Sequence, residues 1–269
     1  MRLLGSWADL QRRAVHPLKV LLAAMCLWLA LPFAASHARD LVVFGEPTLM
    51  NALQRVGAAW RARSGVRVNV FVAPSDLSFA QIQRGARCDL VFALVGPATD
   101  AAERQGIIRP RLRAPLLRNS LLLVARSGSA STIAPSDRTE LASFLKGKRL
   151  AIANPDRDPA GTRGLRSLRE IGLAEEDDKN LVVAESAAGV VQVLTDGAAQ
   201  LGIVYSTDAV VHSNLVALTT LPESSEQAIE YVAVEAIDPQ SETKPFFEFL
   251  RSPEALVLLQ AAGLQVARE

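Results

Sequence analysis

The stretch LGIVYSTDA, Leu201 to Ala209, decides the fold, because it is an apolar strand that runs directly into a turn of small hydroxyl residues. A second junction of this kind is NPDRDPAG, Asn154 to Gly161, and two more lie upstream, at Gly45 to Thr48 and at Ala73 to Ser75. Such junctions place backbone N–H groups, hydroxyls and helix N-termini at the carboxyl edge of a sheet, where an anion can be held without a basic side chain. The pattern favours a binding site over a catalytic one.

Apolar runs alternate with amphipathic segments before these junctions. The first helix is expected to start at Thr48, as its N-cap, and to stop at Ser64 and Gly65. The alternation predicts a largely parallel sheet with helices on its faces. Residues 109–118 are expected to be a solvated basic connector, with an anion-steering patch as the other reading. The expected strands here are 41–44, 66–72 and 90–95, and two further helices begin at Pro74 and Pro97.

The same alternation repeats in the second half and is followed by a late strand, 229–234, which is expected to return beside the first set. The fold class is therefore α/β with two lobes, each a mainly parallel sheet flanked by helices, and two chain crossings. Residues 39–118 with 231–269 form the first lobe, and 119–230 form the second. The other expected strands are 121–125, 149–153, 180–184 and 201–205, and the expected helices are 140–145, 161–171, 188–196, 244–250 and 253–262.

Residues 1–38 have the pattern of a signal peptide. Arg12, Arg13 and Lys19 precede a short apolar run, 20–33, and small residues follow it. We expect ordinary secretion with cleavage before Arg39. An uncleaved anchor and a twin-arginine signal are the other interpretations.

Composition narrows the function of the exported chain. Without residues 1–38 it keeps 25 basic and 27 acidic residues, a formal charge of −2, so no basic field attracts nucleic acid. Cys88 is its single cysteine and is expected to be a buried thiol rather than a nucleophile. His212 is its single histidine, which disfavours zinc sites and hydrolase triads. We expect a protein that is not an enzyme and needs no cofactor.

Several motifs together resemble one known family. They are VVF, TLMNAL, SFAQIQRGARCDLVF, RNSLLLVA, PAG, GIVYSTDA and FFEFLRSPEALVLL, in that order. The chain is similar throughout its exported part to the periplasmic molybdate-binding proteins of ABC transporters, which are type II solute-binding proteins. LGIVYSTDA is the most specific piece.

The resemblance implies a site for a tetrahedral oxyanion, molybdate or tungstate, held by hydroxyls and main-chain N–H groups. It places Thr48 and Ser75 on the first lobe and Ala160, Ala187 and Tyr205 on the second. These residues would hold the metal as an oxyanion, not as a bare cation. A periplasmic monomer that delivers its ligand to a membrane permease is what the family implies.

Taken singly, each of these residues has an ordinary structural explanation. Thr48 and Ser75 are good helix caps, Ala160 suits a crowded helix start, and Tyr205 could be a core aromatic. Their joint occurrence at matching junctions favours the binding site.

The sequence departs from the family pattern most in the first lobe, where two acids are added, Glu46 and Asp76. A carboxylate 4 Å from a monoanion costs about 4 kcal/mol at an effective dielectric of ~20, and about twice that beside a dianion. Either both side chains point away as first-turn acids, or the ligand is not a molybdate-like dianion. Ala93 to Gly96 and Arg163 with Gly164 also differ from the family.

These departures leave two other functions open. A divergent solute-binding protein could use Glu46 and Asp76 for a sulfate-like, organic or cationic ligand. An exported enzyme could use one of them as a general base, but no positioned histidine, metal cluster or nucleophile motif supports that reading.

Overall fold

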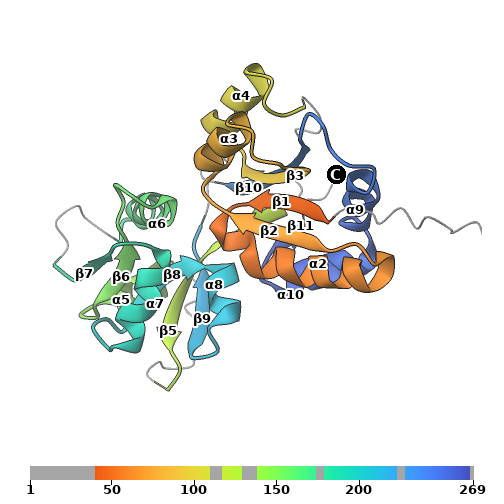
Figure 1. Cartoon of the computed structure of the whole chain (residues 1–269). Helices are drawn as coiled ribbons and strands as arrows, with labels where there is room; N and C mark the ends of the chain where they lie inside the picture. Colours follow the sequence, from red (N-terminus) through yellow and green to blue (C-terminus); the bar gives the residue numbers. More distant parts are fainter. Residues whose placement is uncertain (1–39, 110–116, 129–137, 174–178, 223–227, 267–269) are drawn as a thin grey trace, which may run out of the picture. The chain divides into compact units, whose positions relative to one another are not determined.

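The computed structural model describes residues 40–109, 117–128, 138–173, 179–222 and 228–266, and its elements build two β-sheets (Figure 1). The leader prediction, residues 1–38, lies outside the described residues, as do 110–116 of the predicted connector. In the described part of the chain, none of the helices is both long and apolar enough to cross a membrane.

The first sheet has the strand order β11-β4-β10-β3-β1-β2. Strands β1 (Leu41–Gly45), β2 (Val68–Val72) and β3 (Leu90–Leu94) are parallel, which the continuous apolar runs predicted. The late strand β10 (Ile229–Glu235) pairs antiparallel with β3, with Tyr231 opposite Leu94. Its predicted place beside the first strands is thus confirmed. Two short strands, β4 (Leu117–Asn119) and β11 (Gln265–Val266), complete the sheet.

The second sheet has the strand order β7-β6-β8-β5-β9. Strand β5 lies antiparallel between β8 and β9, and the chain enters this sheet through Ser120, the residue that separates β4 from β5. It is back in the first sheet at Ile229, so the two predicted crossings are present. The strands are β5 (Leu121–Arg126), β6 (Leu150–Ala153), β7 (Leu181–Ala184), β8 (Leu201–Tyr205) and β9 (Leu215–Thr220).

Helices follow most of these strands and cover the sheets. Strand β1 shows the layering by alternation: Leu41 and Val43 pack in one apolar cluster with residues of α2, α9 and α10, whereas Phe44 packs in another with residues of α3 and α4 (Figure 1). The helices are η1 (Pro47–Leu49), α2 (Met50–Ser64), α3 (Ser75–Gln83), α4 (Pro97–Arg104), α5 (Arg138–Leu145), α6 (Pro159–Glu170), α7 (Ala187–Thr195), α8 (Ser206–Val211), α9 (Thr243–Phe249) and α10 (Pro253–Ala261).

Two sequence predictions about local structure were wrong. Thr48 is not a helix N-cap, because Pro47 starts a 3₁₀ turn that contains Thr48, and α2 begins only at Met50. Residues 117–119 are a strand and not a connector, since they pair with β10 and β11. The predicted stop of the first helix is confirmed, with Gly65 in the left-handed conformation at φ 79°. Elements α8, β9 and β11 had not been predicted.

Close packing at the start of α6 leaves no room for a side chain at Gly161. A Cβ at this position would lie 2.2 Å from the carbonyl oxygen of Ala153, the last residue of β6. We expect Gly161→Ala to lower the free energy of unfolding by about 1–3 kcal/mol, the usual cost of overpacking. Chemical denaturation measures it. Gly189→Ala, whose new Cβ would lie 3.3 Å from its nearest neighbour, is the matched control and should change stability far less. Equal effects would contradict this account of Gly161.

Candidate functional site

In the described part of the chain, six junctions bring helix N-termini to the carboxyl ends of parallel strands. In the first sheet η1 and α2 follow β1, α3 follows β2 and α4 follows β3; in the second α6, α7 and α8 follow β6, β7 and β8. Each of the five residues singled out from the sequence lies at one of these junctions. They are Thr48, Ser75, Ala160, Ala187 and Tyr205.

At the first sheet, Glu46 is bound to the start of α3. Its Oε1 accepts a hydrogen bond from the backbone N–H of Ser75 at 2.7 Å and a second one from the Ser75 hydroxyl. The Ser75 hydroxyl also accepts from the backbone N–H of Leu94 at 2.9 Å. Glu46 is only 7% exposed, so this carboxylate points into the site and not away from it. Asp76, by contrast, is exposed in the first turn of α3.

Thr48 lies in the 3₁₀ turn with its hydroxyl directed at β10. Its Oγ1 is 2.8 Å from the hydroxyl oxygen of Tyr231. The Tyr231 hydroxyl is also within 3.4 Å of the side-chain amide nitrogen of Asn119, which is buried at the chain crossing. The predicted ligand hydroxyl is thus held in place by a buried tyrosine that the sequence had not singled out.

At the second sheet, Asp158 binds two helix N-termini at once. It is the N-cap of α6, where its Oδ1 accepts from the backbone N–H of Ala160 at 2.8 Å. Its Oδ2 accepts from the backbone N–H of Ala187, the first residue of α7, also at 2.8 Å. The two backbone donors that the family resemblance assigned to an oxyanion therefore hold a carboxylate of the protein itself.

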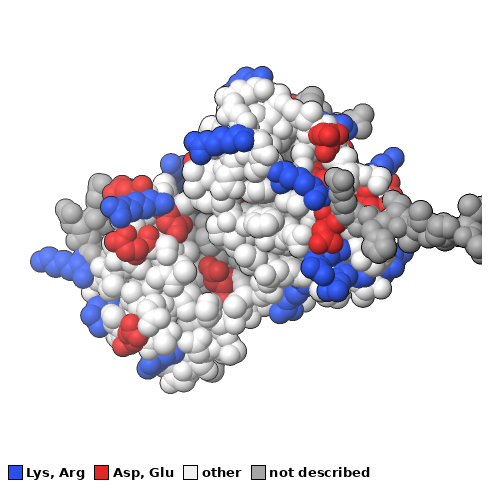
Figure 2. Space-filling view, viewed as in Figure 1, with Lys and Arg blue, Asp and Glu red and all other residues white. Residues whose placement is uncertain are grey.

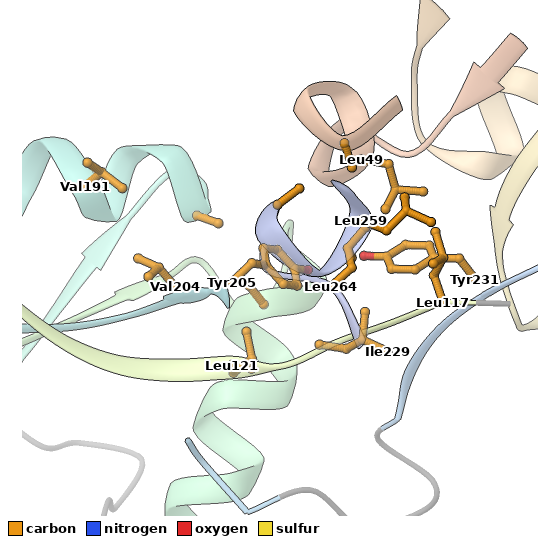
Figure 3. Packing of buried hydrophobic residues seen from close by; sticks show 14 of the residues in the cluster. Leu49, Leu117, Leu121, Val191, Val204, Tyr205, Ile229, Tyr231, Leu259 and Leu264 are labelled. Carbon is orange, nitrogen blue, oxygen red and sulfur yellow. The ribbon is translucent and has the colours of Figure 1, made fainter. Parts of the chain in front are cut away.

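Tyr205 ends β8, and its side chain is nearly buried, 6% exposed. Figure 3 shows its hydroxyl and that of Tyr231 pointing toward one another with Leu264 between them. Within the described part of the chain the Tyr205 hydroxyl has no hydrogen-bond partner. Burial raises its pKa, so it remains a neutral donor. It is both a core aromatic and an available donor.

Arg163 places a positive charge near Glu46 and the two tyrosines, Tyr205 and Tyr231. Its Nη1 is buried and has no hydrogen-bond partner among the described residues. The guanidinium is close enough to lower the pKa of Glu46, Tyr205 and Tyr231 through its charge. With Asp158 it also lines a surface hollow formed by residues 155–159 and the first turns of α6.

Burial is the main cause of the pKa shifts of two acids, Glu46 and Asp208. It raises the pKa of Glu46 from its usual value, against the lowering effect of the two hydrogen bonds from Ser75. The charge of Asp76 raises it further, and that of Arg163 lowers it. Burial also raises the pKa of Asp208, in the first turn of α8, to about 6.

Sequence reasoning missed Asp158, Arg163 and Tyr231 as members of the site. Asp158 carried a readable signal, since an aspartate directly before Pro159 is a typical helix N-cap. Arg163 had been noted only as a departure from the family. The position of Tyr231 depends on strand pairing and had no local signal.

On the face of the molecule shown in Figure 2, basic and acidic side chains are interspersed. Cys88 is a buried free thiol with a pKa raised to about 12 by burial, as predicted for a structural cysteine. The described residues contain no group of three or more histidine, cysteine or acidic side chains that could hold a metal ion.

Comparison with known proteins identifies relatives of this chain over most of its length. Residues 41–265 match the family described as bacterial extracellular solute-binding protein. The molybdate-binding protein ModA of Escherichia coli is 31% identical over 235 residues, which cover 87% of this chain and 91% of that protein. ModA of Haemophilus influenzae is 24% identical over 247 residues, 91% of this chain and 96% of the relative.

Solved structures show the same fold. The periplasmic molybdate-binding protein of Azotobacter vinelandii superposes with a TM-score of 0.65 at 19% identity, covering 85% of this chain and 100% of that one. A tungstate ABC transporter structure from Geobacter sulfurreducens gives a TM-score of 0.58 at 15% identity, covering 82% and 97%. The predicted two-lobed α/β class is confirmed. Both sheets are mixed rather than mainly parallel, because β10 and β4 pair antiparallel with their neighbours in the first sheet and β5 does so in the second.

Asp208 makes stability depend on pH. Its folded-state pKa of about 6 lies above the 3.8 of a free carboxyl, so the folded protein holds the proton more tightly. Stability therefore falls as pH rises from about 4 to about 6 and stays lower above that window. Asp208→Asn can keep the hydrogen bond with the Tyr205 backbone. It should stabilise the protein by up to ~3 kcal/mol at neutral pH and by little near pH ~4.

Thermal denaturation across this pH range measures the effect. The neighbouring charges that oppose or add to it are His212, which lowers the pKa of Asp208, and Asp158, which raises it. An unchanged pH dependence in the asparagine variant would show that another group is responsible.

Proposed function

We propose that this chain, which belongs to the family of bacterial extracellular solute-binding proteins, is the exported receptor of an ABC importer. Its ligand would be a tetrahedral oxyanion, with molybdate and tungstate as the first candidates. The proposed ligand donors are Thr48, Ser75, Ala160, Ala187 and Tyr205. One observation carries the proposal: the backbone N–H groups of Ser75, Ala160 and Ala187 already bind carboxylate oxygens at 2.7 or 2.8 Å. These groups are therefore oriented to receive the oxygens of an anion.

The donor set suffices energetically for useful affinity. A hydrogen bond to a charged acceptor contributes roughly 1.5–3 kcal/mol, and a helix N-terminus adds about 0.3–1 kcal/mol. Several of each, less the cost of ordering, reach the roughly −8 kcal/mol of micromolar binding. Selectivity would come from donor geometry, and no chemical step is required.

The proposed function also has consequences for the lobes, the location and the partner of the protein. Residues 39–118 with 231–269 would form one lobe and 119–230 the other, which the membership of the two sheets supports. The protein would act as a periplasmic monomer after cleavage of residues 1–38, deliver its ligand to a permease, and need no cofactor. The E. coli and H. influenzae relatives are molybdate-binding proteins, which supports a binding function.

One observation favours a second candidate within the same class. The buried Glu46 carboxylate lies among the proposed donors and could pair with a cationic group of an organic ligand. Glu46→Gln separates the candidates, because affinity for a cationic ligand should fall, whereas affinity for an oxyanion should rise or stay unchanged.

We expect molybdate or tungstate to raise the thermal stability of the exported chain. A ligand at about 100 times its dissociation constant stabilises a protein by roughly 2.7 kcal/mol. Differential scanning fluorimetry with molybdate, tungstate, sulfate and phosphate measures the shift. A flat response to all four anions would refute the oxyanion function.

Loss of either hydroxyl should weaken a positive response. Thr48→Ala and Tyr205→Phe each remove one donor and should lower oxyanion affinity about tenfold, measured by calorimetric titration. Thr162→Ala is the control, because this exposed hydroxyl bonds to the Pro155 carbonyl and not to the proposed ligand donors. Full affinity in both test variants would exclude these hydroxyls as ligands.

A further inference from the structure

Four of the donors that the proposed function assigns to an oxyanion are bound to the protein's own carboxylates. Glu46 receives the backbone N–H and the hydroxyl of Ser75, and Asp158 receives the backbone N–H groups of Ala160 and Ala187. We propose that Glu46 and Asp158 are specificity-determining residues that occupy the oxyanion site in the ligand-free protein, so that an oxyanion binds by displacing them. This inference rests on the proposed function, whose donor set it uses.

The geometry of Asp158 exceeds what helix capping requires. An N-cap needs one side-chain oxygen for one or two N–H groups of its own helix. Here Oδ1 serves α6, whereas Oδ2 binds Ala187, the first residue of another helix, at 2.8 Å. Two oxygens of one anionic group thus bridge two helix N-termini, which is the arrangement expected of a bound oxyanion.

Glu46 has the same relation to the first sheet. It is 7% exposed, and one oxygen takes both donors of Ser75. A buried carboxylate needs such partners, since an unpaired one would be strongly destabilising. The charged and titratable groups facing it are Asp76 on α3, Arg163 on α6 and Tyr231 on β10.

Arg163 provides a cationic partner for the displaced carboxylates. Its Nη1 is buried without a hydrogen-bond partner among the described residues, and its charge acts on Glu46. A carboxylate that leaves its amide donors can therefore pair with a cation already in the site. Protonation is a second route for Glu46, because burial raises its pKa.

The primary test compares the affinity of the exported chain and its Asp158→Ala variant for tungstate and sulfate by calorimetric titration. Freeing two backbone donors and removing a negative charge should raise affinity about 10- to 100-fold. Asp156→Ala is the matched control, because it removes the same charge from the same loop. Asp156 is exposed, its backbone N–H is bonded to Asn154, and its carboxylate has no hydrogen-bond partner among the described residues. The affinity of this control variant should be that of the unsubstituted chain.

Asp158→Asn keeps a side-chain oxygen that can cap Ala160. It is therefore the variant to use if Asp158→Ala does not fold. It should give a smaller gain of the same sign. Sulfate takes up no proton in mildly acidic solution, so the unsubstituted chain should bind it more tightly as pH falls and Glu46, whose pKa burial raises, becomes protonated. Glu46→Gln should flatten that pH profile, which a purely structural role of Glu46 would not do.

The outcomes separate the two proposals. Oxyanion binding by the unsubstituted chain, with no gain in Asp158→Ala and Asp158→Asn, would overturn displacement and leave the proposed function intact. Absence of oxyanion binding in every variant would overturn both. Binding that appears only when Asp158 is replaced would also overturn both, because the resident carboxylate would then exclude the oxyanion instead of being displaced by it.

Discussion

The site depends on one constraint: backbone N–H groups in the first turn of a helix have no partner within that helix and must find an acceptor. In the described part of the chain, helix starts meet the carboxyl ends of parallel strands at six such junctions. Buried N–H groups left without acceptors would destabilise the protein by about 1–3 kcal/mol each. The chain satisfies several of them with Glu46 and Asp158 rather than with solvent. The same requirement that stabilises the ligand-free protein therefore creates competition with a ligand.

A buried polar network joins this site to the chain crossing. Asn119, 1% exposed, donates to Thr207 and accepts from Ser206, and its amide nitrogen is within 3.4 Å of the Tyr231 hydroxyl. Tyr231 in turn contacts Thr48. Buried polar groups that are satisfied in this way specify one arrangement, because any shift leaves a partner unpaired. Thr48 is thus coupled to the residues through which the chain passes between its sheets.

The sequence predicted those parts of the fold whose signals are local. Strands such as 90–94 and 201–205 read as continuous apolar runs because they are buried on both faces. Strand β4, with three residues, carries no periodicity, and its pairing with β10 joins segments more than a hundred residues apart. The contact between Thr48 and Tyr231 was missed for the same reason, since the two residues meet only through the tertiary fold.

The site was predictable as a set of positions and not as a set of interactions. The five residues that the family resemblance assigned to the site lie at strand–helix junctions, where the motifs placed them. Their role as ligand donors stays a prediction. Whether a nearby acid points into or out of a site depends on tertiary packing, and here the two added acids differ: Glu46 is buried against Ser75 and Asp76 is exposed. Asp158 was not singled out from the sequence, and its contact with Ala187 at the start of another helix depends on tertiary packing.

A tethered carboxylate is a strong competitor because it is always present at high effective concentration. Each carboxylate, however, serves only one donor group: Glu46 binds Ser75, and Asp158 binds Ala160 with Ala187. A tetrahedral oxyanion carries four oxygens on one centre and, under the proposed function, would engage donors of both groups together with the Tyr205 hydroxyl, which has no partner among the described residues. An anion with fewer oxygens gains no such advantage over the resident carboxylates. Internal competition of this kind therefore raises selectivity for multidentate anions at the expense of affinity for all of them.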